Sequence, residues 1–133
     1  MSERIVMFDS SAVLSILREE PGHQQLHAKV ERADRLAIGA PTLFETAMVA
    51  IGRFGGGGEV LVEQFLDDWK VDVLPFDETH WRVADEAFIR FGKGRHPAAL
   101  NYGDCMTYAS ARLAGMPLLF AGDDFAKTDI PPA

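Results

Sequence analysis

Cysteine is almost absent from the sequence, which contains only Cys105, so no disulfide can form within one chain. Structural disulfides mark oxidising compartments, and a single cysteine is typical of a protein in a reducing one. The opening residues, MSERIVMF, lack the layout of a signal peptide, and no apolar run is long enough to cross a membrane. The sequence therefore predicts a cytoplasmic protein with no membrane partner.

Basic residues are outnumbered, since 13 Lys and Arg face 20 Asp and Glu, which gives a formal net charge of -7. A protein that binds nucleic acid without sequence preference normally has the opposite balance. Net charge is a sum, however, and acids gathered to hold a cation would also lower it. The positions of the acids therefore carry more information than their number.

Strand-like and helix-like segments alternate along the 133 residues, a length that suits one domain with one core. Short apolar runs predict strands at residues 4–8, 35–39, 71–76 and 117–120. The longer segments between them have helical spacing, and four glycines at residues 55–58 predict a turn between two helices. This order favours an α/β domain over residues 1–133, with a central parallel sheet and helices on both faces.

Two acidic positions follow predicted strands. Asp9 comes directly after the first strand, and the pair Asp123 and Asp124 comes shortly after the last. Because ligand sites of open α/β sheets lie beyond the carboxyl ends of the strands, these acids are candidates for a site. Each has an ordinary alternative, since Asp9 suits a helix N-cap and Gly-Asp-Asp suits a solvated turn. These considerations do not decide between Asp123 and Asp124.

Two further acids lie inside predicted helices. Glu45 is the only charged residue between positions 41 and 52, in a segment so apolar that we expect a buried helix. A buried carboxylate is costly unless it is protonated, paired or bound to metal, and the alternative here is a salt bridge to a distant arginine. Asp104 lies at the start of the helix in LNYGDCMTYASARLAG, where Asn101 and Asp104 can form a capping box.

Four of these acids, Asp9, Glu45, Asp104 and Asp124, can converge on one edge of the sheet. Carboxylates crowded there would raise one another's pKa, and a divalent cation removes that repulsion. Oxygen ligands alone suit Mg²⁺, with Mn²⁺ as an alternative. Such a cation orients and polarises a phosphate and activates a water, so the predicted chemistry is phosphodiester hydrolysis.

Four segments carry a resemblance to a known family: FDSSAVLSIL, TLFETAMV, LNYGDCMTYASA and LLFAGDDFAKTDI. In this order and spacing, over essentially the whole chain, they resemble the PIN-domain ribonucleases, and specifically the VapC-type toxins of bacterial toxin–antitoxin pairs. The resemblance implies a three-layer α/β/α domain in which Asp9, Glu45 and Asp104 bind metal. The segment GDDF favours Asp124 as the fourth acid, and Ser11 takes the place of a hydroxyl residue that positions substrate or metal.

The same resemblance implies a Mg²⁺-dependent endoribonuclease that arrests growth by cutting RNA, a VapB-like antitoxin whose C-terminal segment covers the site, and a homodimer. The loop KGRHPAALN places Lys93, Arg95 and His96 just ahead of Asp104, and we expect it to contact RNA phosphates. A solvated loop is the alternative. Arg112, two turns along the helix from Asp104, either helps to position substrate by neutralising the acids or lies on the surface.

Two other functions fit part of the sequence. A phosphotransfer protein can use Asp9 as its nucleophile. Phosphatases of the haloacid-dehalogenase type, however, need a second aspartate where Ser11 stands, and a receiver domain needs an acidic pair that SERIVMFDSS lacks. A non-catalytic module that only binds a partner protein would leave the acids structural. Metal binding separates this module from the nuclease.

Overall fold

Four parallel strands form the centre of the computed structural model, which describes residues 3–133. Their order across the sheet is β3-β2-β1-β4. The strands are β1 (Ile5–Phe8), β2 (Arg35–Gly39), β3 (Asp72–Leu74) and β4 (Leu118–Leu119). Each lies inside a segment that the sequence predicts to be a strand, so the predicted parallel sheet is confirmed.

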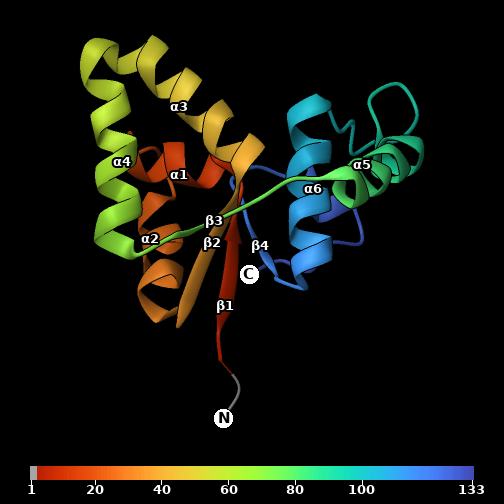
Figure 1. The fold of residues 1–133 in the computed structure, drawn as a ribbon, viewed down its shortest axis with the longest axis horizontal. Coiled ribbons are helices and arrows are strands. Elements are labelled where there is room, and N and C mark those ends of the chain that lie inside the picture. Colours follow the sequence, from red (N-terminus) through yellow and green to blue (C-terminus); the bar gives the residue numbers. More distant parts are fainter. Residues whose placement is uncertain (1–2) are drawn as a thin grey trace.

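Helices connect successive strands and cover both faces of the sheet (Figure 1). They are α1 (Ser10–Leu17), α2 (His23–Arg32), α3 (Ala40–Phe54), α4 (Gly58–Trp69), α5 (Glu78–Phe91) and α6 (Tyr102–Ala114). One pair of helices follows each of the first three strands. In the figure α1, α2 and α4 lie on one side of the sheet and α5 and α6 on the other, which is the expected three-layer arrangement.

The two faces of the sheet bury different side chains because successive residues of a strand point to opposite sides. In β1, Met7 joins a core cluster with side chains of α5 and α6, whereas Val6 and Phe8 join the core beneath α1, α2 and α4. The ring of Phe8 meets Phe65 of α4 edge to face, with ring centres 5.4 Å apart. β1 is thus covered on both faces, as its unbroken apolar run predicts.

The apolar helix α3 is not buried all round, so the prediction of a buried helix is wrong. Its buried stripe consists of Thr42, Thr46 and Ala50, spaced one turn apart. Phe44 and Met48 point the other way and are 67% and 56% exposed, because no other element of residues 3–133 covers that side. α3 therefore presents an apolar surface to the outside. Even so, no helix within residues 3–133 has the length and apolarity to cross a membrane.

The four glycines join α3 to α4, which confirms the predicted turn. Gly55–Gly57 form a short 3-10 helix, and Gly55 has a φ of +67°. A side chain at Gly58 would stand 2.2 Å from the carbonyl oxygen of Ala50, so glycine is what allows the two helices to approach this closely. α3 and α4 consequently form an arm on one side of the molecule (Figure 1).

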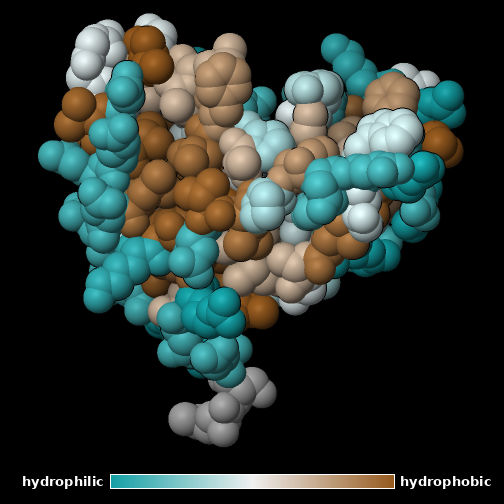
Figure 2. Space-filling model, in the orientation of Figure 1, coloured by the Kyte–Doolittle hydropathy of each residue, from teal (hydrophilic) through white to brown (hydrophobic). Residues whose placement is uncertain are grey.

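The side of the sheet on which the chain adds strands switches at β1. The chain first builds β2 and β3 on one side of β1 and finally places β4 on the other. At such a switch point, neighbouring connections diverge and leave room for a ligand beyond the carboxyl ends of the strands. In Figure 1 these ends point between α3 and α6, and Figure 2 shows that the outline of the molecule is indented there.

Candidate active site

Asp9 lies at the carboxyl end of β1 and is the N-cap of α1. Its Oδ2 accepts hydrogen bonds from the backbone N–H of Ser11, at 3.1 Å, and from the Ser11 hydroxyl. Asp9 is only 4% exposed. This burial raises the pKa of Asp9, although hydrogen bonds from Ser11, Thr107 and Ser10 oppose the rise. The N-cap alternative is therefore correct, and it leaves Asp9 at the edge where the sequence predicts a site.

Ser11 links the ends of two strands. Its hydroxyl donates to Asp9 after β1 and accepts a hydrogen bond from the N–H of Ala121 after β4, at 3.0 Å. The N–H of Asp9 also donates to the carbonyl oxygen of Leu119 in β4, at 3.0 Å. The segment after β4, which carries Asp124, is therefore fixed against the start of α1.

Glu45 is half-buried in α3 and lies against the start of α6. The Ser10 hydroxyl donates to its Oε1 at 3.0 Å. A side chain at Gly103 would stand 2.3 Å from its Oε2, so the bare backbone of α6 makes room for this carboxylate. Within residues 3–133 Glu45 forms no ion pair, so the alternative of a salt bridge to a distant arginine is wrong.

Asp104 starts α6 through a reciprocal pair of hydrogen bonds. Its N–H donates to Oδ1 of Asn101 at 2.9 Å, and its Oδ2 accepts from the N–H of Asn101 at 3.0 Å, which confirms the predicted capping box. Burial is the largest cause of a rise in the pKa of Asp104 to about 6, and the hydrogen bond from Asn101 opposes it. The remaining contributions are the charges of three other acids: Asp9, Asp124 and Glu45.

The acid cluster, as we call Asp9, Glu45, Asp104 and Asp124, is thus brought together at the carboxyl edge of the sheet, as the strand-end positions predict. Asp124 is its exposed member and precedes a short 3-10 helix (Phe125–Lys127) without capping it through its side chain. Its charge acts on Asp104, whereas that of Asp123 is not among the largest contributions. This difference favours Asp124 within the pair.

The acid cluster offers only oxygen atoms to a metal ion. Within residues 3–133 no three His, Cys, Asp or Glu side chains already stand close enough to enclose an ion. Mg²⁺ does not need such a cage, because it keeps several waters and is usually held by one or two carboxylates. Zn²⁺ prefers nitrogen and sulfur ligands. The residues present therefore fit a hard divalent cation such as Mg²⁺ or Mn²⁺, which would also relieve the repulsion on Asp104.

The loop between α5 and α6 carries three residues that the sequence predicts to contact phosphates: Lys93, Arg95 and His96. Lys93 and Arg95 are exposed, although the guanidinium of Arg95 lies over the ring of Phe88, 5.7 Å from its centre. His96 is turned inward, where its ring packs edge to face on Phe91 and its Nδ1 accepts a hydrogen bond from the N–H of Ala98, at 3.0 Å. His96 therefore stabilises the loop, and its contact with a phosphate stays a prediction.

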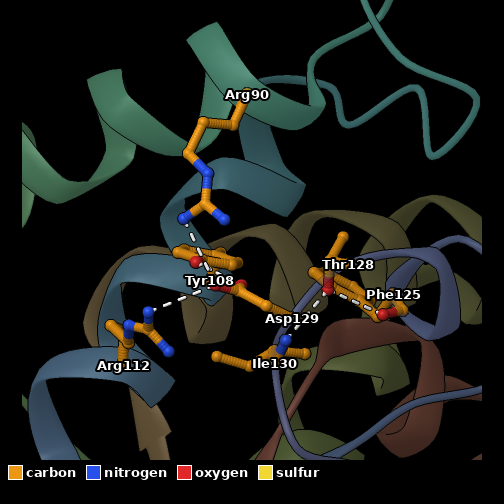
Figure 3. A network of polar contacts seen from close by, with 7 residues as sticks. All are labelled: Arg90, Tyr108, Arg112, Phe125, Thr128, Asp129 and Ile130. Carbon is orange, nitrogen blue, oxygen red and sulfur yellow. Dashed lines mark hydrogen bonds and ion pairs between the residues drawn. The ribbon is translucent and has the colours of Figure 1, made fainter.

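Arg112 belongs to a different polar network from the acid cluster (Figure 3). Its guanidinium and that of Arg90 each lie 3.2 Å from Oδ2 of Asp129, whose Oδ1 accepts a hydrogen bond from the Tyr108 hydroxyl. Burial alone would raise the pKa of Asp129, but the hydrogen bond from Tyr108 and the two arginine charges outweigh it and lower the pKa. Of the two predicted alternatives, Arg112 fits the surface residue, and it anchors the segment that follows the acid cluster.

Several residues that hold the acid cluster in place were not predicted from the sequence, whereas Ser11 and Asn101 were. Among them are Ser10, which donates a hydrogen bond to Glu45, and Gly103, whose bare backbone makes room for the Glu45 carboxylate. Two buried threonines, Thr42 and Thr107, were also missed, although each lies three residues from a helical acid. A hydroxyl one helical turn from a carboxylate, inside an otherwise apolar helix, is the signal that would have identified them.

The strand order and the carboxylates at the edge of the sheet define an α/β domain with an acidic site at its switch point. The family model of the PIN domain matches residues 6–131, so the chain belongs to the PIN-domain family. Its relatives within that family are VapC ribonucleases. The chain is 39% identical over 126 residues to Ribonuclease VapC36 of Mycobacterium tuberculosis, a match that covers 94% of this chain and 91% of the relative.

Solved structures show the same fold at much lower sequence identity. The crystal structure of Mycobacterium tuberculosis VapC20, described as a sarcin-ricin loop cleaving toxin, superposes with a TM-score of 0.79 at 15% identity and covers 96% of this chain and 98% of that one. VapBC-1 from nontypeable Haemophilus influenzae superposes with a TM-score of 0.75 at 18% identity, covering 97% and 96%. At these identities the likeness concerns the fold alone.

Proposed function

We propose that the chain is the toxin of a VapBC-type toxin–antitoxin pair, a metal-dependent endoribonuclease that uses Mg²⁺ and acts on RNA in the cytoplasm. The observation that carries this proposal is the convergence of four carboxylates at the carboxyl edge, three of which act electrostatically on Asp104. The ribonuclease relative at 39% identity over nearly the whole chain supports the same activity.

The proposed reaction assigns a separate task to each part of the site. Bound Mg²⁺ would polarise the scissile phosphate and lower the pKa of a water molecule. Asp9 and Asp104 hold the ion, with Glu45 and Asp124 completing the acidic surroundings. Ser11 keeps the carboxylate of Asp9 oriented toward the edge of the sheet.

The substrate contacts in this proposal come from exposed basic residues. Lys93 and Arg95 stand on the loop that leads into α6, so they can bind phosphates next to the cleavage position. Arg112 lies eight residues beyond Asp104, about 12 Å along the helix axis. It would therefore reach only an RNA that extends well past the cleaved bond.

Cleavage of total cellular RNA by the purified chain tests this proposal. We expect discrete products with Mg²⁺, no cleavage with EDTA, and no cleavage by Asp104→Ala at any Mg²⁺ concentration. Asp123→Ala is the matched control, because it removes an exposed neighbouring acid, and it should cut like the parent. Cleavage that persists in EDTA, or an Asp104→Ala variant as active as the parent, would contradict the proposal.

The two alternative functions make different predictions. A phosphotransfer protein needs an accessible nucleophile, yet Asp9 is 4% exposed and is held by Ser11. Stable aspartyl phosphate after incubation with acetyl phosphate would nevertheless favour that function. A non-catalytic binding module would bind neither Mg²⁺ nor Mn²⁺ in calorimetry, whereas the nuclease must bind at least one of them.

The proposed antitoxin is a VapB-like protein whose C-terminal segment covers the acid cluster. We expect this segment of the antitoxin to carry a basic side chain that complements the four carboxylates. An acidic side chain there would add to the repulsion on Asp104. Expression of the chain without its antitoxin should arrest growth, and expression of Asp104→Ala should not. Growth arrest by both proteins would show that the effect does not depend on the site.

The proposed homodimer uses the apolar surface of α3 and the start of α6. Phe44 and Met48 are exposed beside Tyr102, which is 79% exposed, around a groove of about 310 Å³. Figure 2 shows hydrophobic side chains gathered over the arm that α3 forms with α4. Light scattering should give a dimer for the parent and a monomer for Met48→Glu. Val60→Glu, an exposed apolar position on α4, is the matched control and should leave the dimer intact.

A further inference from the structure

A hollow between α5 and α6 is lined mainly by apolar side chains. Its volume is about 320 Å³, near the lower limit of about 300 Å³ for small-molecule sites. Three of its lining residues are aromatic, and all three remain open to solvent: Trp81 at 50%, Phe88 at 43% and Tyr102 at 79% exposure. We call this hollow, bordered by Trp81, Phe88 and Tyr102, the aromatic pocket.

The aromatic pocket lies next to the acid cluster. Tyr102 comes two residues before Asp104 in the first turn of α6, which packs against α5 (Figure 1). Tyr102 and Met106 also line the groove beside α3 that contains Glu45, so the two hollows share a border. An RNA strand with one phosphate at the acid cluster can therefore reach the aromatic pocket with a neighbouring nucleotide.

Arginine guanidinium groups lie over two rings of the aromatic pocket. That of Arg82 is 5.0 Å from the ring centre of Trp81, and that of Arg95 is 5.7 Å from the ring centre of Phe88. Arg82 is already paired with Glu78, at 3.2 Å, whereas Arg95 forms no ion pair in the part of the chain that the structure describes. Arg95 therefore keeps its charge available beside the pocket.

Exposed aromatic rings next to a cation are the means by which proteins hold single-stranded nucleic acid, because bases stack on the rings and cations meet the phosphates. We infer that the aromatic pocket binds one unstacked base of the RNA strand that the acid cluster cuts. This inference rests on the proposed function, since it takes RNA as the substrate. The small volume suits one planar group, and a base inside a duplex cannot enter it.

The carboxylate of Asp85 adds a preference among the bases. Asp85 lines the aromatic pocket, is exposed, and has no ion-pair partner among residues 3–133. A carboxylate accepts hydrogen bonds from base amino groups, which adenine and cytosine carry and uracil lacks. Strands of A or C should therefore bind more tightly than strands of U.

Fluorescence of Trp81 reports stacking directly. The chain has two tryptophans, so Trp69→Phe leaves Trp81 as the only one. Asp104→Asn, added to the same protein, keeps an acceptor at the start of α6 and prevents cleavage during the measurement. With Mg²⁺ present, short single strands of A or C should quench this fluorescence, and the duplex of A with U should not.

Substitutions at the rings separate stacking from apolar packing. Trp81→Leu and Phe88→Leu should each weaken binding of a labelled A strand, measured by fluorescence anisotropy, about fivefold or more, as for the loss of one stacking partner. Trp81→Phe and Phe88→Tyr keep a ring and should bind like the parent. Ile89→Ala is the matched control, because Ile89 is a neighbouring apolar residue of α5, 62% exposed and outside the pocket.

The outcomes separate this inference from the proposed function. If the parent cuts total cellular RNA but no single strand quenches Trp81, or the leucine variants bind like the parent, the inference is overturned and the proposed function stands. If the parent does not cut RNA, the proposed function fails and the inference fails with it. If the leucine variants lose RNA binding and also change from dimer to monomer in light scattering, the aromatic pocket is an interface between two copies, which likewise overturns the inference.

Discussion

Replacing Asp104 by asparagine removes one charge from the acid cluster and keeps the start of α6. The side-chain oxygen of asparagine can still accept the hydrogen bond that Asn101 donates to Asp104 at 3.0 Å. The change therefore isolates the electrostatic penalty from the capping role. We expect Asp104→Asn to stabilise the metal-free protein at neutral pH and to abolish RNA cleavage.

The magnitude follows from the pKa of Asp104, which rises from its ordinary 3.8 to about 6. Such a difference corresponds to at most about 3 kcal/mol of destabilisation when the carboxylate is ionised. Asp104 is only half-buried, so solvent screening reduces the expected value to roughly 1–2 kcal/mol. For a chain of this size that is a rise in melting temperature of about 3–8 °C.

The sign of the pH dependence is fixed by the same shift. The folded protein binds the proton of Asp104 more tightly than the unfolded chain, so the parent gains stability as pH falls from about 6 to about 4. The gap between Asp104→Asn and the parent should be largest above pH 6 and close at lower pH. Melting curves recorded in EDTA from about pH 4 to neutral pH measure this difference in stability. Asp123→Asn is the matched control. A gap that is absent at neutral pH, or that does not change with pH, would refute the electrostatic account.

Three further predictions concern residues that hold the site in place. Gly103→Ala places a methyl group 2.3 Å from the carboxylate of Glu45, so cleavage should fall at least tenfold in a gel assay, by the scale for displaced metal ligands. Ser10→Ala removes the donor 3.0 Å from Glu45 and should raise the Mg²⁺ requirement for cleavage without lowering the melting temperature. Tyr108→Phe loses the hydrogen bond to Asp129 and should lower the free energy of unfolding by about 1 kcal/mol in urea, with cleavage unchanged.

The sheet and the meeting place of the acids were accessible from the sequence because both follow from chain order. Four apolar runs separated by helical segments favour a parallel sheet. Acids that directly follow parallel strands lie at the same edge of that sheet. The capping box of Asp104 was also predictable, because Asp104 lies only three residues after Asn101 in the sequence. The roles of these acids in metal binding and cleavage stay predictions.

Features that depend on which surfaces meet were not accessible. The composition of α3 indicates burial, yet its inner stripe carries Thr42 and Thr46 while Phe44 faces outward. Periodicity cannot reveal this, because an apolar helix has no polar face from which to infer its orientation. Arg112 was likewise ambiguous, since its partner Asp129 lies in the tail after β4 and only the folded chain brings the two together.

The acid cluster is assembled with the hydrogen bonds that any helix of this fold needs at its start. Asp9 caps α1 and Asp104 closes the capping box of α6, so the backbone donors of two helix starts also hold two of the clustered carboxylates. Donors at helix starts favour negative charge there. They do not cancel the effect of burial on Asp9, or of burial and neighbouring charges on Asp104, because both pKa values remain raised. The fold thus fixes the carboxylates but leaves them repelling one another, which is the condition under which a divalent cation binds with a gain in stability.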